Sequence, residues 1–173
     1  NHVYTSQYGR VVYAWDVVNE YLHASNSGWE AVYGDCGTTP AFVKRAFQYA
    51  YDCTSYFGLT NSVGLFYNDY NTYMEVNDII NYINSDKKIC NGIGMQSHLG
   101  TSFPSVSYYT SALQSFVNAG FEVQITELDV TNTSNSNQAS YLYDLMTNIL
   151  KIKKAGGNIT GLTFWGLSDD VTW

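Results

Sequence analysis

The stretch Val11-Val12-Tyr13-Ala14-Trp15-Asp16-Val17-Val18-Asn19-Glu20 decides the fold class. Residues 11–18 are apolar or aromatic apart from Asp16, which is typical of a strand buried on both faces in a parallel sheet. The polar pair Asn19 and Glu20 follows at once. This segment predicts an α/β fold with chemistry at the carboxyl end of the strand.

Four further strands are predicted to alternate with helices along the chain. The strands are expected over residues 62–68, 92–97, 122–130 and 159–166, and the helices over residues 40–54, 72–84, 105–119 and 136–154. This order indicates a parallel sheet with helices outside it, and both an open doubly wound sheet and a (β/α)8 barrel fit. No glycine-rich phosphate loop follows the first strand, which argues against nucleotide binding.

Composition excludes several function classes. The 173 residues predict one domain, and only 13 % of them are charged, against roughly 25 % in typical domains. The formal net charge of −7 argues against nucleic-acid binding, and no apolar run approaches the roughly 18 residues of a membrane span. The sixteen tyrosines, eight phenylalanines and four tryptophans suit a sugar-binding surface or a core.

The three cysteines do not define a metal site. Cys36, Cys53 and Cys90 have no zinc-type spacing, and the odd number leaves at least one thiol unpaired within the chain. Cys36 and Cys53 can pair or stay free, and the sequence leaves both alternatives open.

Polar residues gather where each predicted strand ends. In a barrel, the carboxyl ends of all strands lie on the face that carries the active site. We therefore expect these clusters to form one site. They are Asn19-Glu20, Asn68-Asp69-Tyr70-Asn71, Gln96-Ser97-His98, Thr126-Glu127-Leu128-Asp129 and Trp165-Gly166-Leu167-Ser168-Asp169-Asp170.

Two of these residues, Glu20 and Glu127, are equipped for glycoside hydrolysis. That reaction needs one carboxyl group that stays protonated as an acid and a second that stays ionised. Asn19 can hydrogen-bond a sugar hydroxyl. His98 can hydrogen-bond Glu127 and keep it ionised, with Asp129 orienting the ring.

Each residue also has a structural interpretation. A single strand-end glutamate is usually a solvated loop residue, His98 can be a structural histidine, and Trp165 and Trp173 can belong to the core. Asp16 and Asp69 are expected to bond backbone amides or Arg10. A zinc site made of His98, Glu20 and Glu127 would draw on three separate strands without an HExxH pair, so we predict no metal and no cofactor.

Taken together, the strand-end motifs resemble those of glycoside hydrolase family 10, the endo-β-1,4-xylanases. The resemblance rests on Trp15-Asp16-Val17-Val18-Asn19-Glu20, Asn68-Asp69-Tyr70-Asn71, Gly92-Ile93-Gly94-Met95-Gln96-Ser97-His98, Ile125-Thr126-Glu127-Leu128-Asp129 and Phe164-Trp165-Gly166-Leu167-Ser168-Asp169. It implies an α/β (β/α)8 TIM barrel. Residues 1–173 would be a partial catalytic domain that covers about strands 4 to 8 and lacks the first three βα units and the last helix.

The resemblance also implies a role for each site residue. Glu20 would be the general acid/base and Glu127 the nucleophile of a retaining mechanism, with their carboxyl groups about 5–5.5 Å apart. Asn19 would bind the sugar 2-hydroxyl, and His98 would bridge Glu127 and Asp129. The other residues of the substrate subsite would be Tyr70, Gln96, His98, Trp165 and Trp173.

The implied partners are xylan or xylo-oligosaccharides, the N-terminal part of the same catalytic domain and a carbohydrate-binding module in the full protein. No cofactor, nucleic acid or membrane is implied. A polymeric substrate implies secretion or surface display. Because an incomplete barrel leaves open strand edges, we expect the chain alone to fold poorly or aggregate. The alternative function is that of an incompetent fragment that at most binds polysaccharide.

Overall fold

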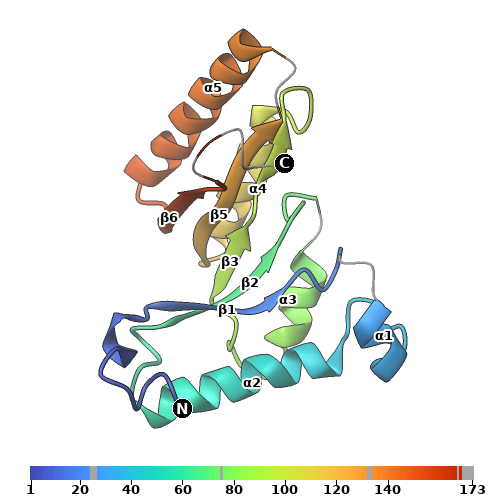
Figure 1. The fold of residues 1–173 in the computed structure, drawn as a ribbon, viewed down its shortest axis with the longest axis vertical. Coiled ribbons are helices and arrows are strands. Elements are labelled where there is room, and N and C mark those ends of the chain that lie inside the picture. The colour runs from blue at the N-terminus through green and yellow to red at the C-terminus, as the bar shows by residue number, and fades with distance from the viewer. Residues whose placement is uncertain (24–26, 75, 132–133, 167, 169–173) are drawn as a thin grey trace. The chain divides into compact units, whose positions relative to one another are not determined.

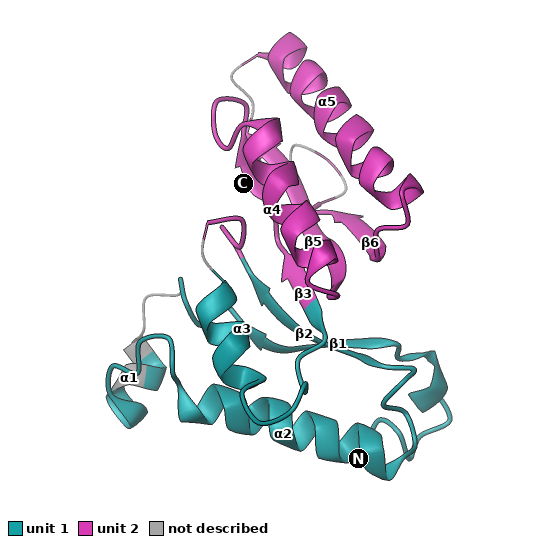
Figure 2. Ribbon diagram, turned by 180° about the vertical axis from the view of Figure 1, so that it is seen from behind, with its two compact units in different colours: residues 1–69, 76–92 teal, residues 70–75, 93–173 magenta. Residues whose placement is uncertain are grey.

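The computed structural model describes residues 1–23, 27–74, 76–131, 134–166 and 168. The chain divides into two compact units, shown in different colours in Figure 2. Unit 1 consists of residues 1–69 and 76–92, and unit 2 of residues 70–75 and 93–173. Each unit is described by itself.

Unit 1 contains β1 (Ala14–Asn19), α1 (Ser27–Tyr33), α2 (Ala41–Tyr56), β2 (Gly64–Asp69) and α3 (Asn77–Ile83). It is a pair of parallel strands on which one helix, α2, packs, and α3 packs on α2 (Figure 1). Every residue of β2 is buried, as the apolar run predicts. The prediction that the first strand is buried on both faces was wrong, because β1 pairs only with β2 among the described residues and none of its residues is buried. Val43 and Phe47 of α2 are fully buried, so this helix supplies the core of unit 1 together with Ile79 and Ile83 of α3.

Unit 2 is built around the long strand β5 (Glu122–Thr131). The neighbours of β5 in the sheet are β3 (Gly92–Met95, of which residues 93–95 lie in unit 2), β4 (His98–Gly100) and β6 (Ile159–Phe164). The pairings of β5 with β4 and β6 are parallel. The helices α4 (Val106–Asn118) and α5 (Asn135–Lys154) pack on each other, and α4 and α5 both contact β5.

All five predicted strands and all four predicted helices are present, but several boundaries were wrong. The first strand begins at Ala14 rather than at residue 11, because residues 9–11 form a 3-10 turn. The predicted strand 92–97 ends at Met95, and His98 opens the separate strand β4. The predicted helix 72–84 begins only at Asn77, so Met74 is not on its apolar side and is 53 % exposed. The helix α1 was not predicted.

The structure also bears on the pairing of the cysteines and on the search for membrane-spanning helices. Cys36, Cys53 and Cys90 are all free thiols, so Cys36 and Cys53 do not pair. Within the described part of the chain, no helix is long and apolar enough to cross a membrane.

Candidate active site

The backbone turns sharply after the first three strands, at residues that are not glycine. Glu20 follows β1 with a φ of 58°, Asn71 follows β2 with 52°, and Ser97 follows β3 with 71°. Left-handed backbone costs a non-glycine residue on the order of 1 kcal/mol or more, and it persists only where neighbouring contacts hold it. Residues held in this way cluster at functional sites.

In unit 1, the end of β2 holds the residues around Glu20. The backbone N–H of Glu20 donates to the carbonyl oxygen of Asn68 at 2.9 Å. The side-chain Nδ2 of Asn68 donates to Oδ1 of Asn19 at 2.8 Å. The parallel register, which places Asn19 opposite Asn68, brings these two amides together. The predicted sugar-binding Asn19 and the predicted acid Glu20 are therefore both attached to β2.

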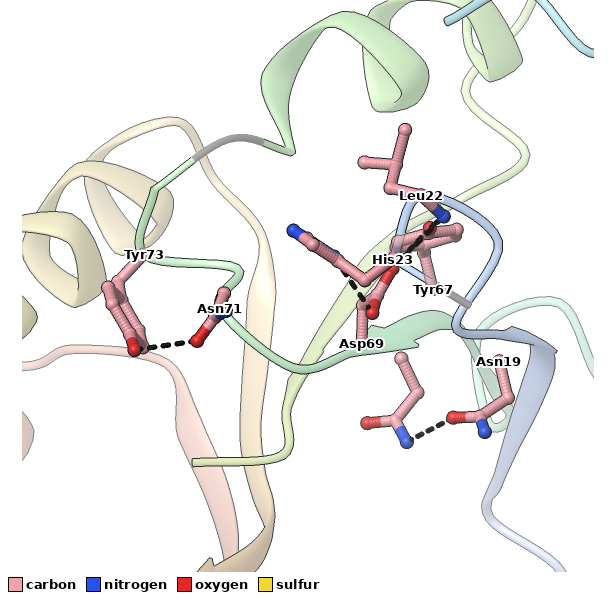
Figure 3. Close-up of polar contacts among 8 residues, drawn as sticks. Asn19, Leu22, His23, Tyr67, Asp69, Asn71 and Tyr73 are labelled. Carbon is pink, nitrogen blue, oxygen red and sulfur yellow. Dashed lines mark hydrogen bonds and ion pairs between the residues drawn. The ribbon is translucent and has the colours of Figure 1, made fainter. Parts of the chain in front are cut away.

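Asp69 extends this attachment to the next residues of the loop (Figure 3). Its side chain is fully buried, and Oδ2 accepts from the hydroxyl of Tyr67 at 2.7 Å and from the N–H of Leu22 at 3.3 Å. The same Leu22 N–H lies 3.0 Å from the hydroxyl oxygen of Tyr67. On the other oxygen, the buried Nδ1 of His23 lies 3.1 Å from Oδ1. The structural interpretation of Asp69 as a partner of backbone amides is confirmed.

The surroundings of Asp69 act on its ionisation in opposite directions. Burial raises the pKa of the Asp69 carboxyl, while the contacts with Tyr67 and His23 lower it, and burial has the larger effect. Burial also raises the pKa of the Tyr67 hydroxyl, and the adjacent Asp69 charge adds to that rise. The Tyr67 hydroxyl is therefore protonated at neutral pH and donates to Asp69.

In unit 2, His98 lies between two carboxylates of β5. Its Nε2 is 3.5 Å from Oε2 of Glu127, and its Nδ1 is 3.0 Å from Oδ1 of Asp129. The register of β4 against β5 places His98 opposite Asp129. Residues two apart on a strand point to the same face, so one imidazole reaches both Glu127 and Asp129. The predicted bridging position of His98 is present in the structure.

Two of the other predicted site residues, Trp165 and Gln96, contact this part of unit 2. The indole ring of Trp165 packs edge-on against His98, with ring centroids 6.1 Å apart, and remains 45 % exposed. Gln96 is buried, and its backbone carbonyl oxygen accepts a hydrogen bond from the backbone N–H of Glu127 at 3.0 Å. Tyr70 is half-buried, and Trp173 lies outside the described residues.

Sequence reasoning missed two tyrosine hydroxyls that fix strand ends in unit 2. The hydroxyl groups of Ser97 and Tyr109 lie 2.6 Å apart, and Tyr109 is fully buried. Tyr73 donates to Oδ1 of Asn71 at 2.7 Å (Figure 3). Ser97 and Asn71 are two of the left-handed residues, so each has a tyrosine that holds it. The only available signal was the unusual number of tyrosines.

Glu20 belongs to unit 1 and Glu127 to unit 2, so the predicted separation of their carboxyl groups stays a prediction. Among the residues that the structure describes, no three histidine, cysteine or carboxylate side chains are grouped so as to hold a metal ion.

Comparison with known proteins identifies the family. The model of glycosyl hydrolase family 10 matches residues 1–173. The chain belongs to glycosyl hydrolase family 10. It is 61 % identical over 175 residues to endo-1,4-beta-xylanase A of Butyrivibrio fibrisolvens, covering 99 % of this chain and 43 % of that relative. It is 40 % identical to the bifunctional endo-1,4-beta-xylanase XylA of Ruminococcus flavefaciens, covering 97 % of this chain and 18 % of that protein.

Solved structures of this family show the same fold. The intracellular xylanase TsXylA of Thermoanaerobacterium saccharolyticum superposes with a TM-score of 0.76 at 30 % identity, covering 99 % of this chain and 54 % of that one. A mutant of the same enzyme in complex with xylotetraose superposes with a TM-score of 0.77 at 29 % identity, with the same coverage. The chain therefore spans about half of the structures it matches, and its fold is part of a (β/α)8 barrel.

Proposed function

We propose that the protein containing this chain is an endo-1,4-β-xylanase that hydrolyses internal β-1,4 bonds of xylan with retention of configuration. The observation that carries the proposal is the Glu127–His98–Asp129 arrangement on β4 and β5. A carboxylate paired with an imidazole, which is itself oriented by a second carboxylate, suits a nucleophile that must stay ionised. The xylanase names of the relatives support the choice of substrate.

In this mechanism the two glutamates have complementary roles. Glu127 attacks the anomeric carbon while Glu20 gives its proton to the departing glycosidic oxygen, which leaves a covalent glycosyl-enzyme. Glu20 then takes a proton from water as the water oxygen displaces Glu127, and the sugar leaves with its original configuration. Asn19, Tyr70, Gln96, Trp165 and Trp173 are proposed to contact the sugar.

The test uses two proteins. One is this chain alone, and the other is the complete domain, in which residues 1–173 are joined to the part of the Butyrivibrio relative that lies outside the match. Reducing-sugar release from β-1,4-xylan is expected from the complete domain. Glu127→Ala should abolish it, and Glu20→Ala should lower it by about 10²–10⁴-fold, the usual contribution of a general acid.

Glu122→Ala is the matched control, because Glu122 lies at the opposite end of the same strand and contacts Thr160. This control should keep the wild-type rate. Full activity of Glu127→Ala would overturn the proposal. If only this chain alone is inactive, the fragment interpretation holds for the 173 residues while the proposed reaction stands for the complete domain.

We further propose that the full protein acts outside the cell in carbohydrate metabolism and carries a carbohydrate-binding module. The argument for the location is that polymeric xylan does not enter cells, and the module is proposed from the family resemblance alone. One solved relative is described as intracellular, so the location needs its own measurement. Xylanase activity in the culture medium of the source organism is expected, and activity confined to the cell lysate would contradict an extracellular role.

A further inference from the structure

We propose that His23 is a positioning residue for the acid Glu20, acting through the buried carboxylate of Asp69. The inference rests on the proposed function, because it assigns a residue to the same reaction. His23 follows Glu20 by three residues and is not among the strand-end residues that the family resemblance picks out.

The geometry is a series of attachments between one loop and one strand end. The N–H of Glu20 donates to the backbone carbonyl of Asn68. The N–H of Leu22 donates to the Tyr67 hydroxyl oxygen and to Asp69. The ring of His23 contacts the Asp69 carboxylate. The dashed contacts in Figure 3 show His23 and Leu22 meeting Asp69 from the same loop. Residues 20–23 are therefore fixed along their length by β2.

The two oxygens of Asp69 have different partners. Oδ2 accepts hydrogen bonds from the Tyr67 hydroxyl and the Leu22 N–H, and Oδ1 lies 3.1 Å from Nδ1 of His23. The Asp69 side chain is fully buried, whereas that of His23 is 15 % exposed. Removing the imidazole would take away the contact that His23 makes with Oδ1. A buried carboxylate oxygen that loses a polar partner raises the free energy of the folded state. The carboxylate would then reorient, and the Leu22 N–H would lose its alignment.

Glu20 is sensitive to such a change because its backbone is left-handed. When the contacts on either side of a strained residue loosen, the residue relaxes toward an ordinary conformation and its carboxyl group moves. A displacement of about 1 Å can cost a factor of about 100 in rate when a reacting group is involved. We expect a tenfold loss for an indirect effect of this kind.

The test separates acid positioning from general damage by changing the leaving group. Departure of an unactivated sugar needs the proton from Glu20, whereas 2,4-dinitrophenolate leaves without one. In the complete domain, His23→Ala should lower kcat/KM for xylotetraose about tenfold and leave kcat/KM for 2,4-dinitrophenyl β-xylobioside unchanged. His23→Asn, whose Nδ2 occupies the place of Nδ1, should restore most of the xylotetraose rate.

His2→Ala is the control, because His2 is an exposed histidine that precedes His23 by 21 residues in the chain. Equal losses on both substrates would show a purely structural role, and no loss on either would show that His23 does not act on Glu20. Both results overturn the inference. The Glu127→Ala variant in the same panel reports on the proposed function separately, since it must be inactive on both substrates.

Discussion

The buried carboxyl of Asp69 should make the stability of unit 1 depend on pH in an unusual direction. Its pKa in the folded protein is raised above the ordinary value of 3.8. Between the ordinary and the raised pKa, the folded state binds more protons than the unfolded state. The free energy of unfolding therefore falls as the pH rises through the raised pKa of Asp69, and is recovered on acidification toward 3.8.

Asp69→Asn removes this titration and keeps an acceptor for Tyr67 and Leu22. The melting temperature of the complete domain, measured from pH 4 upwards, should fall less steeply in Asp69→Asn than in the wild type. Asp144→Asn, at an exposed position of α5, should follow the wild type. A steeper fall in Asp69→Asn would contradict the assigned direction of the pKa shift.

The sequence sufficed for some site residues because their contacts follow local rules. Glu127 and Asp129 are two apart on one strand, so a histidine on the neighbouring strand reaches both, and His98 was predicted to do so. For Asp69, a bond to a backbone amide was predicted, but its actual partners Leu22, Tyr67 and His23 were not. Leu22 and Asp69 are 47 residues apart, and only the pairing of β1 with β2 brings them together.

At the level of elements, Gly92 in β3 is expected to tolerate no side chain. A methyl group at this position would lie 2.5 Å from ring carbons of Phe66, which is buried in β2. Such overpacking costs about 1–3 kcal/mol, so Gly92→Ala should lower the free energy of unfolding of the complete domain by that amount in urea. Unchanged stability would mean that the Phe66 ring has room to move.

Gly28→Ala is the opposite control. Gly28 lies in α1, and a methyl group added there would meet no atom within 4 Å. Alanine at this position should therefore stabilise the helix by up to about 1 kcal/mol, because alanine has the higher helix propensity.

The strands could be predicted because they are apolar runs in the sequence, although β1 and β6 are largely unburied in this chain, but other elements lacked a clear signal. The helix α1 has only seven residues, too few for a periodic apolar pattern to stand out, and Trp29, Val32 and Tyr33 are 58 %, 71 % and 51 % exposed. The start of α3 was placed too early because Thr72 and Tyr73 are buried in the preceding loop. The break between β3 and β4 falls at Ser97, whose backbone is left-handed. Glycine is the usual residue in that conformation, so a serine gives no sequence signal for the turn.

At the scale of the whole molecule, the outer strands should govern how this chain behaves alone. Among the described residues, β1 pairs only with β2, and β6 only with β5. Trp15 on β1 is 38 % exposed, and Phe164 on β6 is 58 % exposed. Unpaired strand edges with apolar side chains favour association. Light scattering after size-exclusion chromatography should therefore find oligomers or aggregates of the isolated chain.

Adding the N-terminal part of the domain as a second polypeptide should convert these species into a defined complex with xylanase activity. A monomer of the isolated chain with a cooperative thermal transition would contradict this expectation. The complete domain, in which neighbouring strands cover both edges, is the control for solubility.

The left-handed backbone at Glu20 has a consequence for selection. Glycine adopts a φ of 58° without the penalty that glutamate bears, so the folding equilibrium alone would favour glycine at this position. Glycine has no carboxyl group and could not take the acid role proposed for Glu20. A library of random variants screened only for thermal resistance should therefore enrich Glu20→Gly over Glu20→Ala, and the enriched variants should hydrolyse xylan about 10²–10⁴-fold more slowly.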